Sequence, residues 1–296
     1  MMENLLSAMD AILITGPTAS GKSALAVELA KRRNGVVVNA DSMQVYDTLR
    51  VLTARPSDDD MQGVPHCLYG HVSAGNAYST GAWLRDVEEL LPRLRAEGRL
   101  PIFVGGTGLY FKALTGGLSD MPAIPDEVRA RLRARLQEEG AERLHSQLTD
   151  GDPSVAAGLS PQDGQRIVRA LEVLEATGRS IADFRGRAGP VIVDPGAAQK
   201  IVVLPERAIL HARINGRFEK MLEEGAEDEV KALLSLSLSP DMPAMKAIGV
   251  SQIADMLDGT MSRSEVLEKG AAATRQYAKR QMTWFRNQMD ESWERR

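Results

Sequence analysis

The chain has 296 residues, of which 43% are hydrophobic and 26% charged, as expected for a globular protein with a sizeable core. Its formal net charge of −4 gives no global indication of nucleic-acid binding, so any RNA contact must come from local patches. The single cysteine, Cys67, excludes an intramolecular disulfide and suits a reducing compartment. No apolar run approaches the roughly eighteen residues of a membrane span. Residues 1–10 lack a signal-peptide pattern, so we expect a short flexible start, a cytoplasmic location and no membrane partner.

A phosphate-loop pattern follows the first predicted strand, residues 11–15. It consists of Gly16, Pro17, Thr18, Ala19, Ser20, Gly21, Lys22 and Ser23. A helix is predicted directly afterwards, over residues 24–33, and this context favours a site for a di- or triphosphate. In such a site Lys22 reaches the outer phosphate and the Ser23 hydroxyl binds Mg²⁺. The alternative is a plain glycine-rich turn between strand and helix.

A second strand is predicted over residues 35–39, and Asp41 follows it closely. A carboxylate at this end of a strand lies where open α/β sheets bind ligands. A helix N-cap at Asp41 or Ser42 is an equally good interpretation from this stretch alone. Residues 47–78 are predicted to form an irregular loop, which at this length is usually functional or mobile.

An amphipathic helix is predicted over residues 80–97, with Gly98 ending it, and a third strand over residues 100–104. The glycines of the next segment, residues 105–110, indicate close approach of the backbone to a ligand, and Thr107 offers a hydroxyl there. A plain strand-to-helix turn is the alternative. No carboxylate ends this strand, so the magnesium-holding acid of a phosphate-loop hydrolase is missing.

Residues 120–195 are predicted to form a helical insertion domain in an α/β core built from residues 1–119 and 196–296. The insertion begins at a proline-rich stretch and contains predicted helices that start at Asp126 and Asp163. Its bases do not outnumber its acids, so most of its arginines are expected to be solvated.

The chain returns to the sheet with a predicted strand over residues 200–204 and a helix over residues 206–222. Arg213 and Arg217 share one face of that helix, so both can point at one phosphate cluster, or both can pair with surface acids such as Glu219 or Glu223. A helix over residues 225–236 follows. The last long helix contains residues 274–288, a run with four bases and no acid. Its bases suit an RNA backbone, whereas its aromatic residues are assigned to the core.

Five segments together resemble the bacterial tRNA dimethylallyltransferases, also called tRNA isopentenyltransferases. They are residues 16–23 (GPTASGKS), 41–46 (DSMQVY), 105–110 (GGTGLY), 165–172 (QRIVRALE) and 273–284 (ATRQYAKRQMTW). The segments occur in the family's order and span nearly the whole chain. The resemblance implies an α/β fold with a P-loop NTPase-like parallel sheet flanked by helices. It also implies transfer of a dimethylallyl group from dimethylallyl diphosphate to the adenosine just 3′ of the anticodon in tRNA.

The resemblance also implies roles for individual residues. It assigns the diphosphate to residues 16–23, Mg²⁺ to Ser23, and catalysis to Asp41 as general base with Lys22, Thr107 and Arg217. The residues it assigns to the anticodon arm of tRNA are Asp41, Ser42, Met43, Gln44, Thr107, Arg129, Gln165, Arg166, Ile167, Val168 and Arg169. Leu52, Cys67, Val250 and Ser251 depart from the family's usual residues. No self-pairing element is evident, so we expect a monomer.

Two other classes compete with this interpretation. A phosphate-loop kinase of a small metabolite fits residues 16–23 equally well, but it leaves the basic run in the last helix unexplained. A non-catalytic RNA-binding protein does not need Lys22, Ser23 and Asp41 together.

Overall fold

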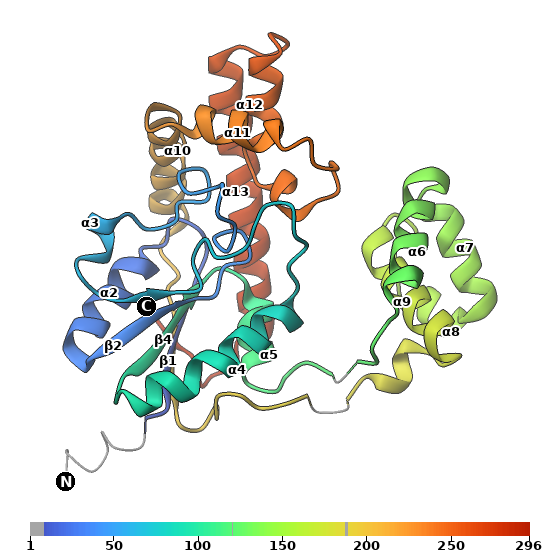
Figure 1. Cartoon of the computed structure of the whole chain (residues 1–296), viewed down its shortest axis with the longest axis horizontal. Coiled ribbons are helices and arrows are strands. Elements are labelled where there is room, and N and C mark those ends of the chain that lie inside the picture. The colour runs from blue at the N-terminus through green and yellow to red at the C-terminus, as the bar shows by residue number, and fades with distance from the viewer. Residues whose placement is uncertain (1–8, 120, 187–188) are drawn as a thin grey trace. The chain divides into compact units, whose positions relative to one another are not determined.

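The computed structural model describes residues 9–119, 121–186 and 189–296. Most of the expected flexible start, and residue 120 at the expected domain boundary, lie outside these ranges. The chain divides into two compact units (Figure 1). One contains the chain up to Thr115 together with Val191–Arg296, and the other contains Gly116–Pro190. Whether the second unit acts as an insertion domain of its own stays a prediction.

A six-stranded sheet of parallel strands organises the first unit, in the order β3-β2-β4-β1-β5-β6. The strands are β1 (Ala11–Thr15), β2 (Gly35–Asn39), β3 (His66–Cys67), β4 (Leu100–Gly105), β5 (Ala198–Val202) and β6 (Glu294–Arg295). The predicted α/β class with a parallel sheet is therefore confirmed.

Both faces of the sheet are covered by helices, which explains why its central strands are almost entirely apolar. Alternate residues point to opposite faces. Ile12, Ile14 and Ile102 pack against α2 (Lys22–Arg33), whereas Leu13 and Phe103 pack in the core that contains α4 (Thr80–Ala96). The buried stripe of α4 comprises the five residues that the helical spacing predicts: Trp83, Val87, Leu90, Leu91 and Leu94.

Two sequence-based assignments in this unit need correction, and one strand was not predicted. Residues 47–78 are not wholly irregular, because they contain α3 (Asp58–Met61) and the edge strand β3. The predicted strand at 200–204 begins and ends two residues earlier, at Ala198 and Val202. β6 has only two residues, both polar, and it forms by pairing with β5, which no local pattern can reveal.

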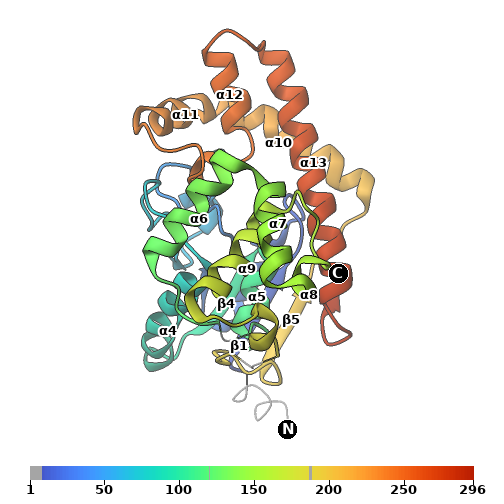
Figure 2. The same cartoon turned by 90° about the vertical axis from the view of Figure 1, so that its right-hand side faces the viewer.

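The remaining helices of this unit follow β4 or β5. They are α5 (Gly108–Leu114), α10 (Arg207–Glu223), α11 (Ala226–Ser235), the 3₁₀ turn η2 (Pro243–Lys246), α12 (Val250–Leu257) and α13 (Arg263–Gln288). The basic run is thus the second half of a longer helix, α13, which lies beside α10 and α12 (Figure 2). Of the aromatic residues assigned to the core, Phe285 is buried, whereas Tyr277 and Trp284 are only half-buried on α13.

The second unit is helical and has its own apolar core. It contains α6 (Asp126–Glu139), α7 (Ala141–Gly151), α8 (Pro153–Ala156), α9 (Gly164–Thr177) and the 3₁₀ turn η1 (Ile181–Phe184). Asp163 caps α9 by accepting a hydrogen bond from the Arg166 N–H, and Gly178 ends it in the left-handed conformation, as their positions predict. Within the described ranges, no helix is long and apolar enough to cross a bilayer.

Trp83 joins α4 to the end of β2, so its replacement tests how much this contact stabilises the fold. It is fully buried, its Nε1–H donates to the Asn39 carbonyl at 2.8 Å, and it stacks on Tyr110 with ring centroids 4.4 Å apart. Trp83→Phe keeps an aromatic ring but removes the donor, and should lower the free energy of unfolding by about 1–3 kcal/mol. Urea denaturation measures this. The control is Leu236→Ala at a position 48% exposed, where a change within about 0.5 kcal/mol is expected. An equally small change for Trp83→Phe would contradict the prediction.

Candidate active site

The phosphate loop lies between β1 and α2, and its shape depends on glycine. Gly16 has φ 156°, and a Cβ there would lie 2.5 Å from the Val203 carbonyl oxygen, so a larger residue would collide with backbone. Gly21 precedes α2 with φ 92°, in the left-handed region that favours glycine. The Ser20 hydroxyl is buried without a hydrogen-bond partner in the described chain. The loop therefore holds a polar group available to a ligand at the N-terminus of a helix.

Two cationic side chains and Asp41 influence one another electrostatically beside this loop. Burial lowers the pKa of Lys22 to about 8, Asp41 raises it and Arg217 lowers it further. Burial also lowers the pKa of Arg217, while Asp41 and Asp60 oppose that shift. Lys22 Nζ donates to the Pro17 carbonyl at 3.1 Å. Arg217 is half-buried. In the parts of the chain that are described it makes no hydrogen bond or ion pair, so no direct contact compensates the charge of its guanidinium.

Arg213 lies one turn before Arg217 on α10. Its Nη1 donates to the Ser20 carbonyl of the phosphate loop at 3.3 Å. Within the described ranges, no ion pair joins either arginine to Glu219 or Glu223, the acids that a surface pair would use. The contact to Ser20 favours the first of the two predicted arrangements, in which this face of α10 points at the phosphate loop.

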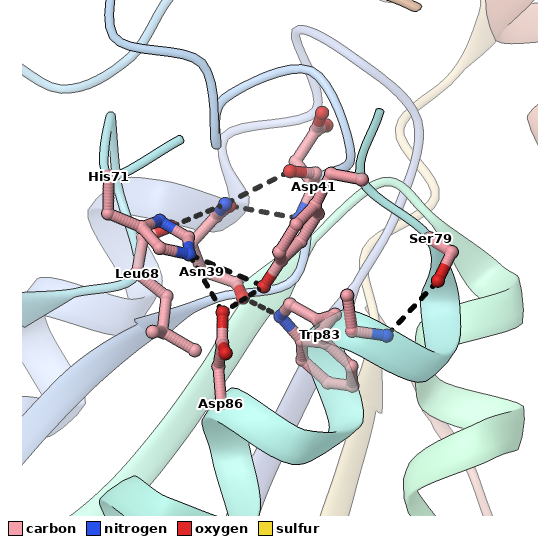
Figure 3. Close-up of polar contacts among 9 residues, drawn as sticks. Asn39, Asp41, Leu68, His71, Ser79, Trp83 and Asp86 are labelled. Carbon is pink, nitrogen blue, oxygen red and sulfur yellow. Dashed lines mark hydrogen bonds and ion pairs between the residues drawn. The ribbon is translucent and has the colours of Figure 1, made fainter. Parts of the chain in front are cut away.

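Asp41 is held in place by its own loop (Figure 3). Its N–H donates to Asn39 Oδ1 at 2.9 Å. Its Oδ1 accepts from the Met43 N–H at 3.0 Å. The fully buried Asn39 donates through Nδ2 to the carbonyls of Asp41 and Leu68, both at 3.0 Å. No helix begins at Asp41 or Ser42, so the N-cap interpretation is wrong: the carboxylate closes a turn instead.

Thr107 ties the loop after β4 to the loop after β2. Its Oγ1 accepts from the Ser42 N–H at 2.9 Å and donates to Ser42 Oγ at 3.2 Å. It precedes α5 but makes no cap bond with its side chain, so its hydroxyl serves the neighbouring loop rather than its own helix. Thr107 and Asp41 thus belong to one hydrogen-bonded unit.

The glycines of the 105–110 segment allow close protein packing at this edge of the sheet. A Cβ on Gly105 would lie 1.9 Å from the Ala40 carbonyl oxygen, and one on Gly108 would lie 2.1 Å from the Trp284 ring. At these two positions the close neighbour is protein, so the prediction that the glycines allow approach to a ligand needs correction there.

Tyrosines surround the carboxylate. Burial, and next the negative charge of Asp41, raise the pKa of Tyr69, Tyr110 and Tyr277. Their hydroxyl groups therefore remain protonated and neutral near Asp41. Tyr110 falls within one of the five family-like segments and Tyr277 was assigned to the core, but no spacing in the sequence links the three tyrosines, because they come from separate parts of the chain.

Two further residues support the site but were not identified from the sequence. Asn39 was assigned only as the end of a strand. Gln281 lies within the basic run of α13, yet it is buried with Ala278 and Phe285 on the inner face of the helix. A polar residue in an apolar stripe was the available signal.

His71 forms a separate polar cluster with Asp86 and Tyr78 (Figure 3). Its Nε2 lies 3.0 Å from Asp86 Oδ2 and 3.3 Å from the Tyr78 hydroxyl. His66 instead contacts the Val64 carbonyl through Nδ1 at 2.8 Å. The described residues contain no group of three or more His, Cys, Asp or Glu side chains that could hold a metal ion.

The remaining predicted tRNA residues differ in what they present to solvent. Met43 is half-buried, and Gln44 uses its Nε2 to hold the carbonyls of Thr53 and Ala54, both at 2.9 Å. In the helical unit, Gln165 and Arg166 are exposed, whereas Ile167 and Val168 are buried in the core.

The three arginines of the helical unit that the resemblance assigns to tRNA each pair with an acid on the same helix or at its cap. The pairs are Arg129 with Asp126, Arg166 with Asp163 and Arg169 with the buried Glu172. Contacts of the 165–169 segment with a partner must therefore come from its exposed members, because the side chains of Ile167 and Val168 are not accessible.

Residues 44–288 match the family model described as IPP transferase. A tRNA dimethylallyltransferase of Rhizobium etli is 77% identical over 294 residues, with 99% of each chain covered. One from Agrobacterium fabrum is 72% identical over 295 residues, which cover 100% of this chain and 99% of the relative.

Solved structures agree with these matches. The tRNA isopentenylpyrophosphate transferase of Bacillus halodurans is similar with a TM-score of 0.67 at 35% identity, covering 97% of this chain and 89% of that one. A eukaryotic dimethylallyltransferase acting on tRNA is similar with a TM-score of 0.79 at 26% identity, covering 94% of this chain and 70% of that one. Because the family model covers most of the chain and the relatives match it over nearly its full length, the chain belongs to the IPP transferase family.

Proposed function

We propose that this site transfers a dimethylallyl group from dimethylallyl diphosphate to the exocyclic N6 amine of the adenosine 3′-adjacent to the anticodon in tRNA, releasing diphosphate. The observation that carries the proposal is the mutual influence of Asp41, Lys22 and Arg217, in which a fixed carboxylate lies beside cations at a phosphate loop. Close relatives are named for this activity.

The cations act on the leaving group. As the allylic C–O bond breaks, positive charge develops on the prenyl carbon and negative charge on the diphosphate. Lys22, Arg217 and the N–H groups of the loop stabilise that negative charge, and because they are already in place they need no reorganisation during the reaction. Arg213 supports the loop through the Ser20 carbonyl.

Asp41 acts on the amine. The adenine N6 amine is a weak nucleophile, but it becomes strongly acidic once the new C–N bond forms, so a carboxylate is a sufficient base. Asp41 Oδ1 is occupied by the Met43 N–H, which leaves Oδ2 for the proton. The adenine must leave its base stack to reach this carboxylate, at a cost of a few kcal/mol.

The residues also suit Mg²⁺ bound together with the diphosphate. The Ser23 hydroxyl is exposed at the start of α2 and makes no hydrogen bond within the described ranges, so it is available as a ligand. The described residues offer no acidic cluster for a metal alone, which fits an ion that takes further oxygens from the diphosphate. An ion held there would supply positive charge against the negative charge that develops on the leaving group.

The bases of α13 and of the helical unit are proposed to contact the anticodon arm. Lys279 and Arg280 are exposed, and they line an open groove of about 530 Å³ with Trp284 and polar residues of the same helix. A groove with bases, amides and one aromatic ring suits an RNA backbone with an adjacent base.

Substitutions at Lys22 and Asp41 should separate the two halves of the reaction. Lys22→Ala should weaken binding of dimethylallyl diphosphate and slow transfer, because it removes a charge facing the leaving group. Asp41→Asn keeps an oxygen for the Met43 N–H, so diphosphate binding should persist while turnover falls about 10²- to 10⁴-fold. A transfer assay on tRNA and a calorimetric binding measurement test both variants.

Two results would contradict the assignment of Asp41. Near-wild-type turnover of Asp41→Asn would mean that the base lies elsewhere. Loss of diphosphate binding in this variant would indicate that the carboxylate holds a metal ion instead.

Diphosphate binding should take up protons near pH 8. The pKa of Lys22 is about 8 in the free protein, so roughly half of the molecules then carry a neutral amine. The charge of the diphosphate favours the ammonium form and raises this pKa, so binding at pH 8 should take up about half a proton, and affinity should fall at higher pH. Calorimetry with pyrophosphate in two buffers of different ionisation enthalpy measures the uptake. Lys22→Arg stays charged and should take up about half a proton less, whereas equal uptake would contradict the prediction.

Salt dependence should reveal the tRNA contacts. If Arg129, Arg166, Arg169, Arg275 and Lys279 neutralise tRNA phosphates, replacing all five with glutamine should flatten the slope of log affinity against log salt by about three to five. Filter binding between low and physiological salt measures the slope. Neutralising Arg32 and Lys231, exposed bases with acidic partners on their own helices, is the control that should leave it unchanged. An unchanged slope in the fivefold variant would mean that these bases are only solvated.

A further inference from the structure

Gln281 is a buried polar residue on the helix that carries the basic run. Its side chain is 6% exposed, whereas Lys279 and Arg280 beside it are exposed. α13 thus has an outer face with bases and an inner face with Gln281 directed at the sheet edge. The proposed reaction does not use this carboxamide as a base, an acid or a ligand of the diphosphate.

Both ends of the carboxamide bond to loops of the candidate active site. Oε1 accepts from the Thr18 N–H of the phosphate loop at 3.0 Å, and Nε2 donates to the Gly106 carbonyl at 2.9 Å. The two loops follow neighbouring strands, β1 and β4, which pair in parallel register up to Thr15 and Gly105. One side chain therefore fixes the separation of the two loops just beyond the end of their strand pairing.

The Asp41 carboxylate lies against the same point. A Cβ built on Gly106 would lie 2.3 Å from Gln281 Nε2 and 3.3 Å from Asp41 Oδ2. Glycine at this position lets the amide and the carboxylate approach the same stretch of backbone. The amide thus contacts both the loop that binds the leaving group and the stretch of backbone that the Asp41 carboxylate also faces.

We propose that Gln281 is a positioning residue that sets the phosphate loop relative to Asp41, and so aligns the two ends of the transfer reaction. This inference rests on the proposed function. Its alternative is a purely structural role, since a buried amide with both ends bonded also stabilises the fold. The two differ in outcome, because a structural residue changes the folded fraction, whereas a positioning residue changes the affinity of folded molecules for diphosphate.

Two substitutions of nearly equal size separate these roles. Gln281→Met removes both hydrogen bonds, and should raise the Kd for pyrophosphate and the KM for dimethylallyl diphosphate about tenfold and lower kcat. Gln281→Glu should raise the pyrophosphate Kd by a similar factor at pH 8, because its carboxylate cannot donate a hydrogen bond to the Gly106 carbonyl. Burial and the nearby Asp41 carboxylate disfavour the ionised form of this glutamate, so at pH 6 part of the population should be protonated and able to donate to Gly106 while accepting from Thr18. Its pyrophosphate Kd should therefore move toward that of wild type as the pH falls from 8 to 6.

The measurements are pyrophosphate calorimetry and tRNA transfer kinetics at pH 6, 7 and 8, each relative to wild type at the same pH. Gln199→Met on β5, outside the site, is the matched control and should change neither constant. Gly106→Ala is a second test that keeps the glutamine itself. The added methyl group would collide with the Gln281 amide and displace it, so this variant should also raise the pyrophosphate Kd.

The inference is overturned if Gln281→Met, Gln281→Glu at pH 8 and Gly106→Ala all bind pyrophosphate as wild type does, whatever their melting temperatures. Absence of transfer by the wild-type protein would instead refute the proposed function, since pyrophosphate binding is measured separately.

Discussion

Parallel pairing of β1, β2 and β4 is the constraint on which the site depends. Thr15 pairs with Gly105, and Asn39 pairs with Val104, so these three strands end at one level. The chain leaves each strand into a loop that carries one part of the site: the phosphate loop, the Asp41 turn and the Thr107 turn. Because parallel strands place their carboxyl ends on the same edge, the register alone brings together residues that are far apart in sequence.

Close packing then fixes these loops against one another. Glycines at 16, 105, 106 and 108 stand where a Cβ would collide with a carbonyl, an amide or an indole ring. Side chains from other elements bridge the loops, with Thr107 bonded to Ser42 and Gln281 bonded to Thr18 and Gly106. The loops are therefore packed and hydrogen-bonded to one another without a ligand, which suits catalysis by positioned charges.

The charges of the site are poorly compensated in the free protein. Burial works against the charged forms of Lys22 and Arg217, and the described residues give Arg217 no direct partner. A half-buried cation without a partner lowers stability, and an anionic ligand removes that cost. Arg129 and Arg166 of the helical unit differ, since each pairs with a nearby acid, and such exposed ion pairs contribute little to stability.

The sequence by itself determined the elements whose cause is local. Apolar runs fixed β1, β2 and β4, the 3.6-residue spacing fixed the buried stripe of α4, and Asp163 and Gly178 marked the ends of α9, because each signal lies within one element. The phosphate-loop pattern and the order of the five segments also pointed to the family that the comparisons then showed. Tertiary structure alone decided the rest. β6 exists only by pairing with β5, Asp41 closes a turn rather than capping a helix, and Gln281 acquires its partners from residues 175 and 263 positions away. Contacts over such separations arise from the packing of whole elements, and no local pattern in the chain encodes them.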